Sequence, residues 1–139
     1  LWKTLNDLQN RNNADTMIGL RIIYILNIIV AGQIAILALS NPKNSTLTTL
    51  GNAYQPTEVI KLVGCLWLAI AILSILGLWK PITFSPVLLI QLIYKGTWLM
   101  VVALPAFKND IPFPKAMALF FIAWVLILPF LIPWKEWFN

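Results

Sequence analysis

The sequence contains no histidine, a single cysteine and few charged residues. Without histidine, the chain cannot supply imidazole ligands to haem or a metal, and it cannot build a Ser-His or Cys-His catalytic pair. The lone Cys65 excludes an internal disulfide, a CxxC redox pair and a cysteine-held cluster. We therefore predict no metal site and no cofactor, and we expect the protein not to be an enzyme.

Apolar residues dominate what remains. They make up 60% of the 139 residues, and charged residues make up 11%. Soluble domains are about 45–50% apolar and about 25% charged, and a core of this size could not bury so much apolar surface. Lipid must cover much of it. The net charge of +5 comes mostly from lysines beside apolar runs, so anionic lipid headgroups fit it better than nucleic acid does.

Four apolar runs are long enough to be considered as membrane-spanning helices, which need about 20 residues. We predict an all-α fold, an integral membrane four-helix transmembrane bundle formed by a single domain, residues 1–139. The predicted spans cover residues of about 17–39, 58–79, 87–104 and 115–132. A polar loop of residues 40–57 separates the first two spans, and shorter turns separate the others.

The first sixteen residues form a polar segment with a sparse apolar stripe. Leu1, Leu5 and Leu8 recur at helical spacing, which is typical of a short helix lying in the membrane interface. Asp15 and Thr16 could then cap the first span as a separate helix. A frayed polar tail is the simpler alternative for so short a segment.

The number of spans predicts where the chain ends lie. With four spans, both termini are on one side of the membrane, and the pairs Trp2-Lys3, Trp79-Lys80 and Trp134-Lys135 fall together there. Tryptophan and lysine at one level form the belt that anchors a protein at the interface. Basic residues number five on this side against four on the other, which favours cytoplasmic termini only slightly.

Lys95 lies near the middle of the third span. A charge at the centre of a bilayer costs at least about 2.5–3.5 kcal/mol, so it marks a candidate functional site. Counting about 1.5 Å of rise per residue from the loop-side helix ends places several polar and aromatic residues about 10–18 Å deep. The candidate ligand- or partner-binding residues are Lys95, Gln91, Tyr94, Trp98, Trp67, Trp124 and Asn27.

No acidic residue is predicted in this layer, so four explanations for Lys95 remain. Aromatic faces with Asn27 or Gln91 could stabilise the ammonium. Burial could leave the amine uncharged. A partner subunit or lipid could supply a carboxylate or phosphate, or a carbonyl or anionic ligand could bind, including as a Schiff base. The simplest alternative is a lysine that only extends toward the interface. Gly96 should let another backbone approach the site.

Two functions follow from these residues. The first is a non-catalytic subunit or assembly partner of a larger membrane complex or homo-oligomer, in which Lys95 pairs with a partner carboxylate or lipid. The second is a binder or carrier of a small hydrophobic or anionic ligand, quinone- or lipid-like, in a Lys/Trp-lined pocket. An enzyme would depend on Lys95, Cys65 and a few acids at helix ends, whose spacing matches no catalytic motif.

The second span offers one resemblance. Its sequence GCLWLAIAILSILGLWKP, residues 64–81, resembles small four-helix bacterial membrane proteins such as the DoxX-like group. The resemblance covers this helix alone, and it assigns no function to the chain.

Overall fold

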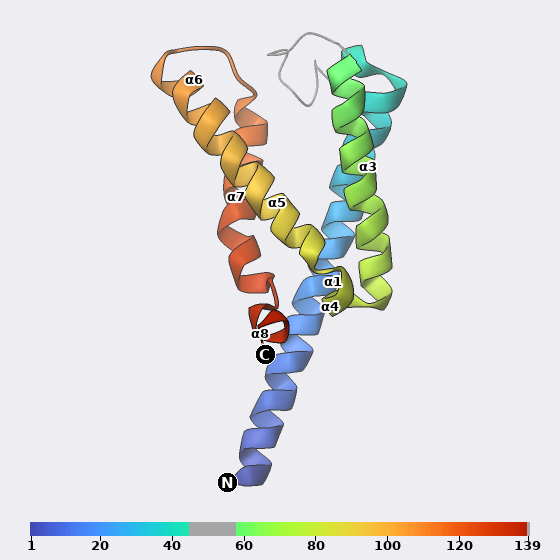
Figure 1. Cartoon of the computed structure of the whole chain (residues 1–139), viewed down its shortest axis with the longest axis vertical. Coiled ribbons are helices and arrows are strands. Elements are labelled where there is room, and N and C mark those ends of the chain that lie inside the picture. Colours follow the sequence, from blue (N-terminus) through green and yellow to red (C-terminus); the bar gives the residue numbers. More distant parts are fainter. Residues whose placement is uncertain (45–57, 139) are drawn as a thin grey trace.

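The computed structural model describes residues 1–44 and 58–138, where every regular element is a helix (Figure 1). The elements are α1 (Trp2–Ser40), α3 (Glu58–Trp79), α4 (Pro81–Phe84), α5 (Pro86–Trp98), the π-helical turn η1 (Leu99–Ala103), α6 (Leu104–Lys108), α7 (Lys115–Leu131) and α8 (Trp134–Trp137). The predicted all-α class is confirmed. Most of the predicted 40–57 loop lies outside the described residues.

Three helices are long and apolar enough to cross a membrane. They are α1, α3 and the nearly continuous helix Pro81–Lys108, which joins α4 to α6. The fourth predicted span corresponds to α7, which is apolar but only 17 residues long. The protein is thus a candidate membrane protein by length and composition.

Helix α1 differs from the prediction. It runs without interruption over 39 residues, so the N-terminal segment is not a separate interfacial helix. Neither proline nor glycine interrupts residues 2–18. Thr16 does not cap a new helix: its hydroxyl donates to the Asn12 carbonyl one turn earlier, at 2.9 Å. The polar first sixteen residues are exposed and extend away from the other helices (Figure 1).

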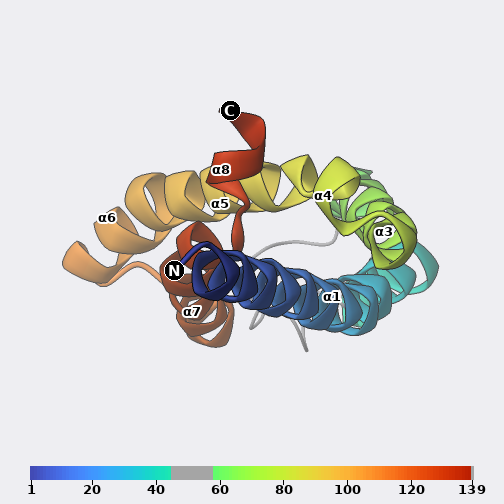
Figure 2. The same cartoon turned by 90° about the horizontal axis from the view of Figure 1, so that it is seen from below.

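The helices form two hairpins. Helix α1 packs along α3, and α5 with η1 packs against α7. The hairpins approach each other near α4 and separate toward the opposite end of the molecule (Figure 1). Seen along the long axis, α3 and α7 lie at opposite ends of an elongated ring whose sides are α1 and α5 (Figure 2).

Small residues bring α1 and α3 together. A Cβ on Gly64 would lie 2.9 Å from the Ala38 Cβ, and one on Gly77 would lie 2.7 Å from the Tyr24 ring. The Tyr24 side chain is fully buried, and its hydroxyl donates to the Pro81 carbonyl at 2.7 Å. This contact ties the middle of α1 to the start of α4.

The third predicted span extends past its expected end. The predicted span ends at residue 104, but α6 contains Pro105 and continues to Lys108. The preceding turn is π-helical, with the Leu104 N–H donating to the Leu99 carbonyl. A proline ring clashes with the carbonyl four residues earlier, and this wider turn is one way to relieve the clash. The helix therefore passes through the proline.

A capped turn connects α6 to α7. Asp110 adopts a left-handed conformation, φ 52°, and the Ile111 N–H donates to the Ala106 carbonyl at 2.9 Å. This is the hydrogen bond of a Schellman C-cap, which fixes the end of α6. Helix α7 then contains Pro129 and continues only two residues beyond it.

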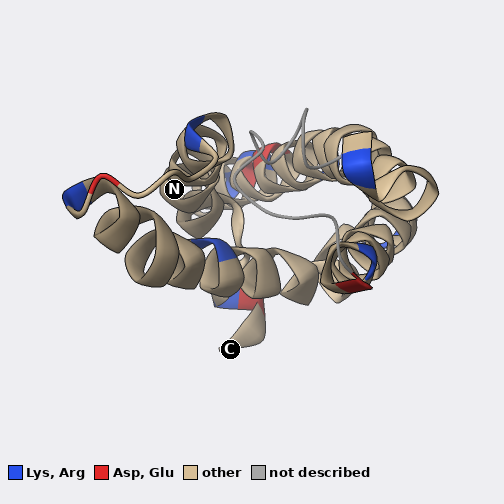
Figure 3. Cartoon of the chain, turned by 90° about the horizontal axis from the view of Figure 1, so that it is seen from above, with Lys and Arg blue, Asp and Glu red and all other residues tan. Residues whose placement is uncertain are grey.

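The charged residues leave long stretches of α1, α3 and α7 without charge (Figure 3). Trp79 and Trp134 lie at the end of the molecule that holds α4 and α8, as the predicted belt requires (Figure 1). Trp2 does not share this level. Because α1 is continuous, Trp2 lies fifteen residues, or about 22 Å, beyond the predicted start of the first span at residue 17.

Candidate functional site around Lys95

Lys95 borders a small cavity to which all four long helices contribute. Helix α5 supplies Lys95 and its neighbours, α7 supplies two aromatic rings, and α1 and α3 close the other side. The lining residues are Asn27, Val30, Ala31, Trp67, Ile70, Gln91, Tyr94, Lys95, Phe120 and Trp124. The cavity volume is about 10 Å³, which is room for about one water molecule. We call this set of residues the Lys95 centre.

The Lys95 ammonium is held inside the protein. Its side chain is 3% exposed, and Nζ donates to the Gln91 Oε1 at 2.6 Å, one helical turn earlier on α5. The same oxygen accepts a second hydrogen bond, at 3.0 Å, from the Trp124 Nε1 on α7. Gln91 thus links Lys95 to the neighbouring helix, and the amine does not extend toward either interface.

Aromatic rings surround the amine. Its nitrogen lies 4.8 Å from the centroid of Tyr94, 5.5 Å from Phe121, 5.7 Å from Trp124 and 5.9 Å from Phe120. Ring faces attract a cation within about 6 Å. Three of these four rings come from α7, so packing of α5 against α7 creates the aromatic environment.

Six of the seven predicted site residues line this cavity, and Trp98 does not. We expected Trp98 to flank the amine, since it lies three residues from Lys95. Instead, its ring packs edge-to-face on Phe121, with centroids 5.2 Å apart. Phe120 and Phe121 were missed because phenylalanine in an apolar span has no polar group to mark it. Their spacing of four and three residues before Trp124 could have indicated a shared face.

The Lys95 centre contains more hydrogen-bond donors than acceptors. The side-chain nitrogens of Asn27 and Gln91 are buried and have no hydrogen-bond partner. Lys95 can donate up to three hydrogen bonds, and one is made. Buried polar groups without partners are uncommon in proteins. The centre can therefore accept an oxygen atom from a carbonyl, a carboxylate or a water molecule.

None of the five acidic residues lines this cavity. Each is exposed and lies near a helix end, in a turn or in the N-terminal extension of α1: Asp7, Asp15, Glu58, Asp110 and Glu136. Glu58 forms an ion pair with Lys61 at 2.8 Å. The charge of Lys95 thus has no internal acidic partner, as the sequence predicted.

Two neighbouring positions differ from expectation. Within residues 1–44 and 58–138, no atom outside the helix's own backbone and its chain neighbours lies within 4 Å of a Cβ built on Gly96, so no other described backbone approaches the site there. Gly96 instead belongs to the outer face of α5. Cys65 is exposed on α3 and does not line the cavity.

Comparison with protein-family models, with curated proteins and with solved structures gave no match.

Proposed function

We propose that the protein is a non-catalytic, four-span integral membrane protein that binds the oxygen of a small amphiphile, such as a quinone carbonyl or a carboxylate, at the Lys95 centre. One observation carries this proposal. Three buried donor groups, on Lys95, Gln91 and Asn27, border one cavity that contains no acid, and the side-chain nitrogens of Gln91 and Asn27 have no hydrogen-bond partner.

The size of the cavity limits what enters it. About 10 Å³ accommodates a single oxygen atom and not a ring or chain. The ligand's head group would therefore meet the donors, while its apolar body would lie between the α1–α3 and α5–α7 hairpins. Aromatic side chains at the cavity, such as Phe120 and Trp124, would pack against a flat head group.

Tryptophan fluorescence can test binding, because Trp67 and Trp124 line the cavity. Protein in lipid nanodiscs is titrated with a short-chain quinone, and separately with decanoate as competitor. We expect saturable quenching that decanoate reverses, and at least a tenfold weaker response in Lys95→Met. Trp98→Phe is the matched control and should retain binding. Quenching that never saturates, or that is unchanged in Lys95→Met, would contradict the proposal.

Helix α7 is the candidate for the fourth span. Residues 116–133 carry no charge, and 17 helical residues reach about 26 Å, close to the roughly 30 Å of a bilayer core. We infer that α7 crosses the membrane, so that both termini share one side, with the cytoplasm slightly favoured by the count of basic residues. Single cysteines replacing Asn10, Asn109 and Glu136, in a Cys65→Ser background, can be labelled with a membrane-impermeant maleimide. Residues 10 and 136 should label from the same side and residue 109 from the other.

A role as subunit of a larger assembly is the second candidate, and one observation favours it. Gln33 is exposed on α1 well inside the predicted first span, and no atom lies within 4 Å of a Cβ built on its neighbour Gly32. A polar side chain next to an open glycine suits a helix from another chain. Size-exclusion chromatography with light scattering should then detect an oligomer or partner that Gln33→Leu weakens. A monodisperse monomer would remove this support.

A further inference from the structure

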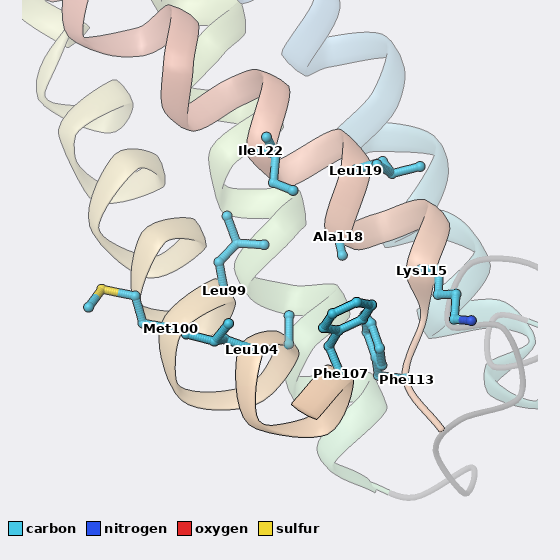
Figure 4. A pocket seen from close by; sticks show the side chains of 10 residues that line it. Leu99, Met100, Leu104, Phe107, Phe113, Lys115, Ala118, Leu119 and Ile122 are labelled. Atoms are coloured by element: carbon cyan, nitrogen blue, oxygen red, sulfur yellow. The ribbon is translucent and has the colours of Figure 1, made fainter. Parts of the chain in front are cut away.

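A second, larger cavity shares no lining residue with the Lys95 centre. It is a groove of about 580 Å³ between η1 and α6 on one side and α7 on the other. Leu99, Leu104 and Phe107 line the first wall, and Ala118, Leu119 and Ile122 line the second (Figure 4). None of these residues borders the Lys95 centre.

The groove is open on the outside of the molecule. Phe107 and Leu119 on opposite walls are 70% and 69% exposed, and Met100 is 72% exposed. Its volume lies within the range of about 300–1,000 Å³ that is typical of ligand pockets. The π-helical turn supplies part of one wall, and such turns are frequent at functional sites.

One end of the groove is basic. Lys115 lies where α7 begins, and it is the only charged residue among those lining the groove (Figure 4). Lys108 occupies the last turn of α6, and Asp110 lies in the capped turn between them. This end of the groove therefore has two lysines and one aspartate beside an apolar channel. An apolar tail with a negatively charged head group complements both parts.

We propose that this groove binds one acyl chain of an anionic membrane phospholipid, whose phosphate pairs with Lys115. The chain lies along the apolar walls, and the head group lies at the membrane surface where α7 starts. The site is distinct from the Lys95 centre, so it holds whether or not that centre binds an amphiphile.

Native mass spectrometry of protein released from nanodiscs tests the proposal. The discs contain equal amounts of phosphatidylglycerol and phosphatidylcholine, which differ in head-group charge. We expect the protein to retain phosphatidylglycerol at least several-fold over phosphatidylcholine. Lys115→Gln should abolish this preference, while Lys135→Gln, a lysine at the opposite end of the molecule, should preserve it.

A second variant addresses the apolar walls. Leu104 is half-exposed, so Leu104→Trp can fill the groove with little effect on folding, which circular dichroism would verify. Retention of both lipids should fall in this variant. Equal retention of the two lipids by the unaltered protein would overturn the proposal. A preference that survives Lys115→Gln, or retention unaffected by Leu104→Trp, would also overturn it.

Discussion

The two hairpins are held together by different means. Helices α1 and α3 are in close backbone contact through small residues, with Gly64 against Ala38 and Gly77 against Tyr24. Helices α5 and α7 meet through large rings and a shared amide oxygen, with Gln91 bonded to both Lys95 and Trp124. The contacts between large side chains in the second hairpin leave space beside them. Both cavities discussed above have a wall on α7 and a wall on α5 or its continuation.

The largest loss of stability is expected at Gln91, whose side-chain oxygen links α5 to α7 in the second hairpin. Gln91→Leu removes the oxygen that accepts from both Lys95 and Trp124, leaving a buried amine and a buried indole N–H without this acceptor. Breaking a buried charged contact costs about 3–5 kcal/mol. Thermal unfolding in detergent should show a large loss of stability. The double variant Lys95→Met/Gln91→Leu should recover much of it, and a double variant as unstable as Gln91→Leu would refute this account.

The first hairpin should be most sensitive at Gly77. In Gly77→Ala, the new methyl group would lie 2.7 Å from the Tyr24 ring, which is fully buried and has little room to move. Overpacking of this kind costs about 1–3 kcal/mol. The same unfolding measurement should show this loss.

Gly96→Ala is the matched control, because nothing lies within 4 Å of its Cβ. Alanine is favoured over glycine in a helix by about 0.5–1 kcal/mol, so this variant should be as stable as the parent or slightly more stable. If Gly77→Ala and Gly96→Ala behave alike, close approach does not define the first hairpin.

A smaller effect is expected at the contact between α1 and α4. Tyr24→Phe removes the hydroxyl that donates to the Pro81 carbonyl but keeps the ring against Gly77. A neutral hydrogen bond contributes about 0.5–1.5 kcal/mol. The melting temperature should fall modestly, by less than in Gly77→Ala. A larger fall than in Gly77→Ala would mean that the hydrogen bond from α1 to α4 stabilises the fold more than the close packing of α1 on α3.

The smallest effect is expected at Trp98, which lies next to the Lys95 centre without lining it. Trp98→Phe preserves an aromatic contact with Phe121 and removes no hydrogen bond that the structure contains. Stability should change by less than about 1 kcal/mol, the order expected for an exchange of similar apolar side chains. A loss comparable to that of Gln91→Leu would place Trp98 in the centre after all.

The helices could be predicted from the sequence because the position and length of an apolar run indicate the position and length of the helix that it forms. Helix α3 begins and ends at the predicted Glu58 and Trp79. Helix ends were less predictable where tertiary structure intervened: the π-helical turn allows the helix to pass Pro105. The join at Asp15-Thr16 was wrong for a local reason, since a threonine side chain can bond back to its own helix as well as cap a new one.

Most of the Lys95 centre could be predicted because helical rise converts residue number into depth. Counting the rise along each helix was enough to predict Asn27, Trp67 and Trp124 near the level of Lys95. All three line its cavity. Depth does not fix which way a helix faces. This explains the misplaced Trp98 and the missed Phe120 and Phe121, whose direction depends on how α5 and α7 pack. The groove at Lys115 could not be predicted, because it depends on the angle between two helices.

The π-helical turn at Leu99–Ala103 also has a consequence for register. One extra residue in a helical turn rotates every following side chain by about 100° relative to an uninterrupted α-helix. In an ordinary helix, Phe107 would occupy a different azimuth and would no longer face α7 across the groove. Removal of one residue from this turn would therefore re-aim the whole end of the helix while leaving Lys95 and Gln91, which precede it, in place.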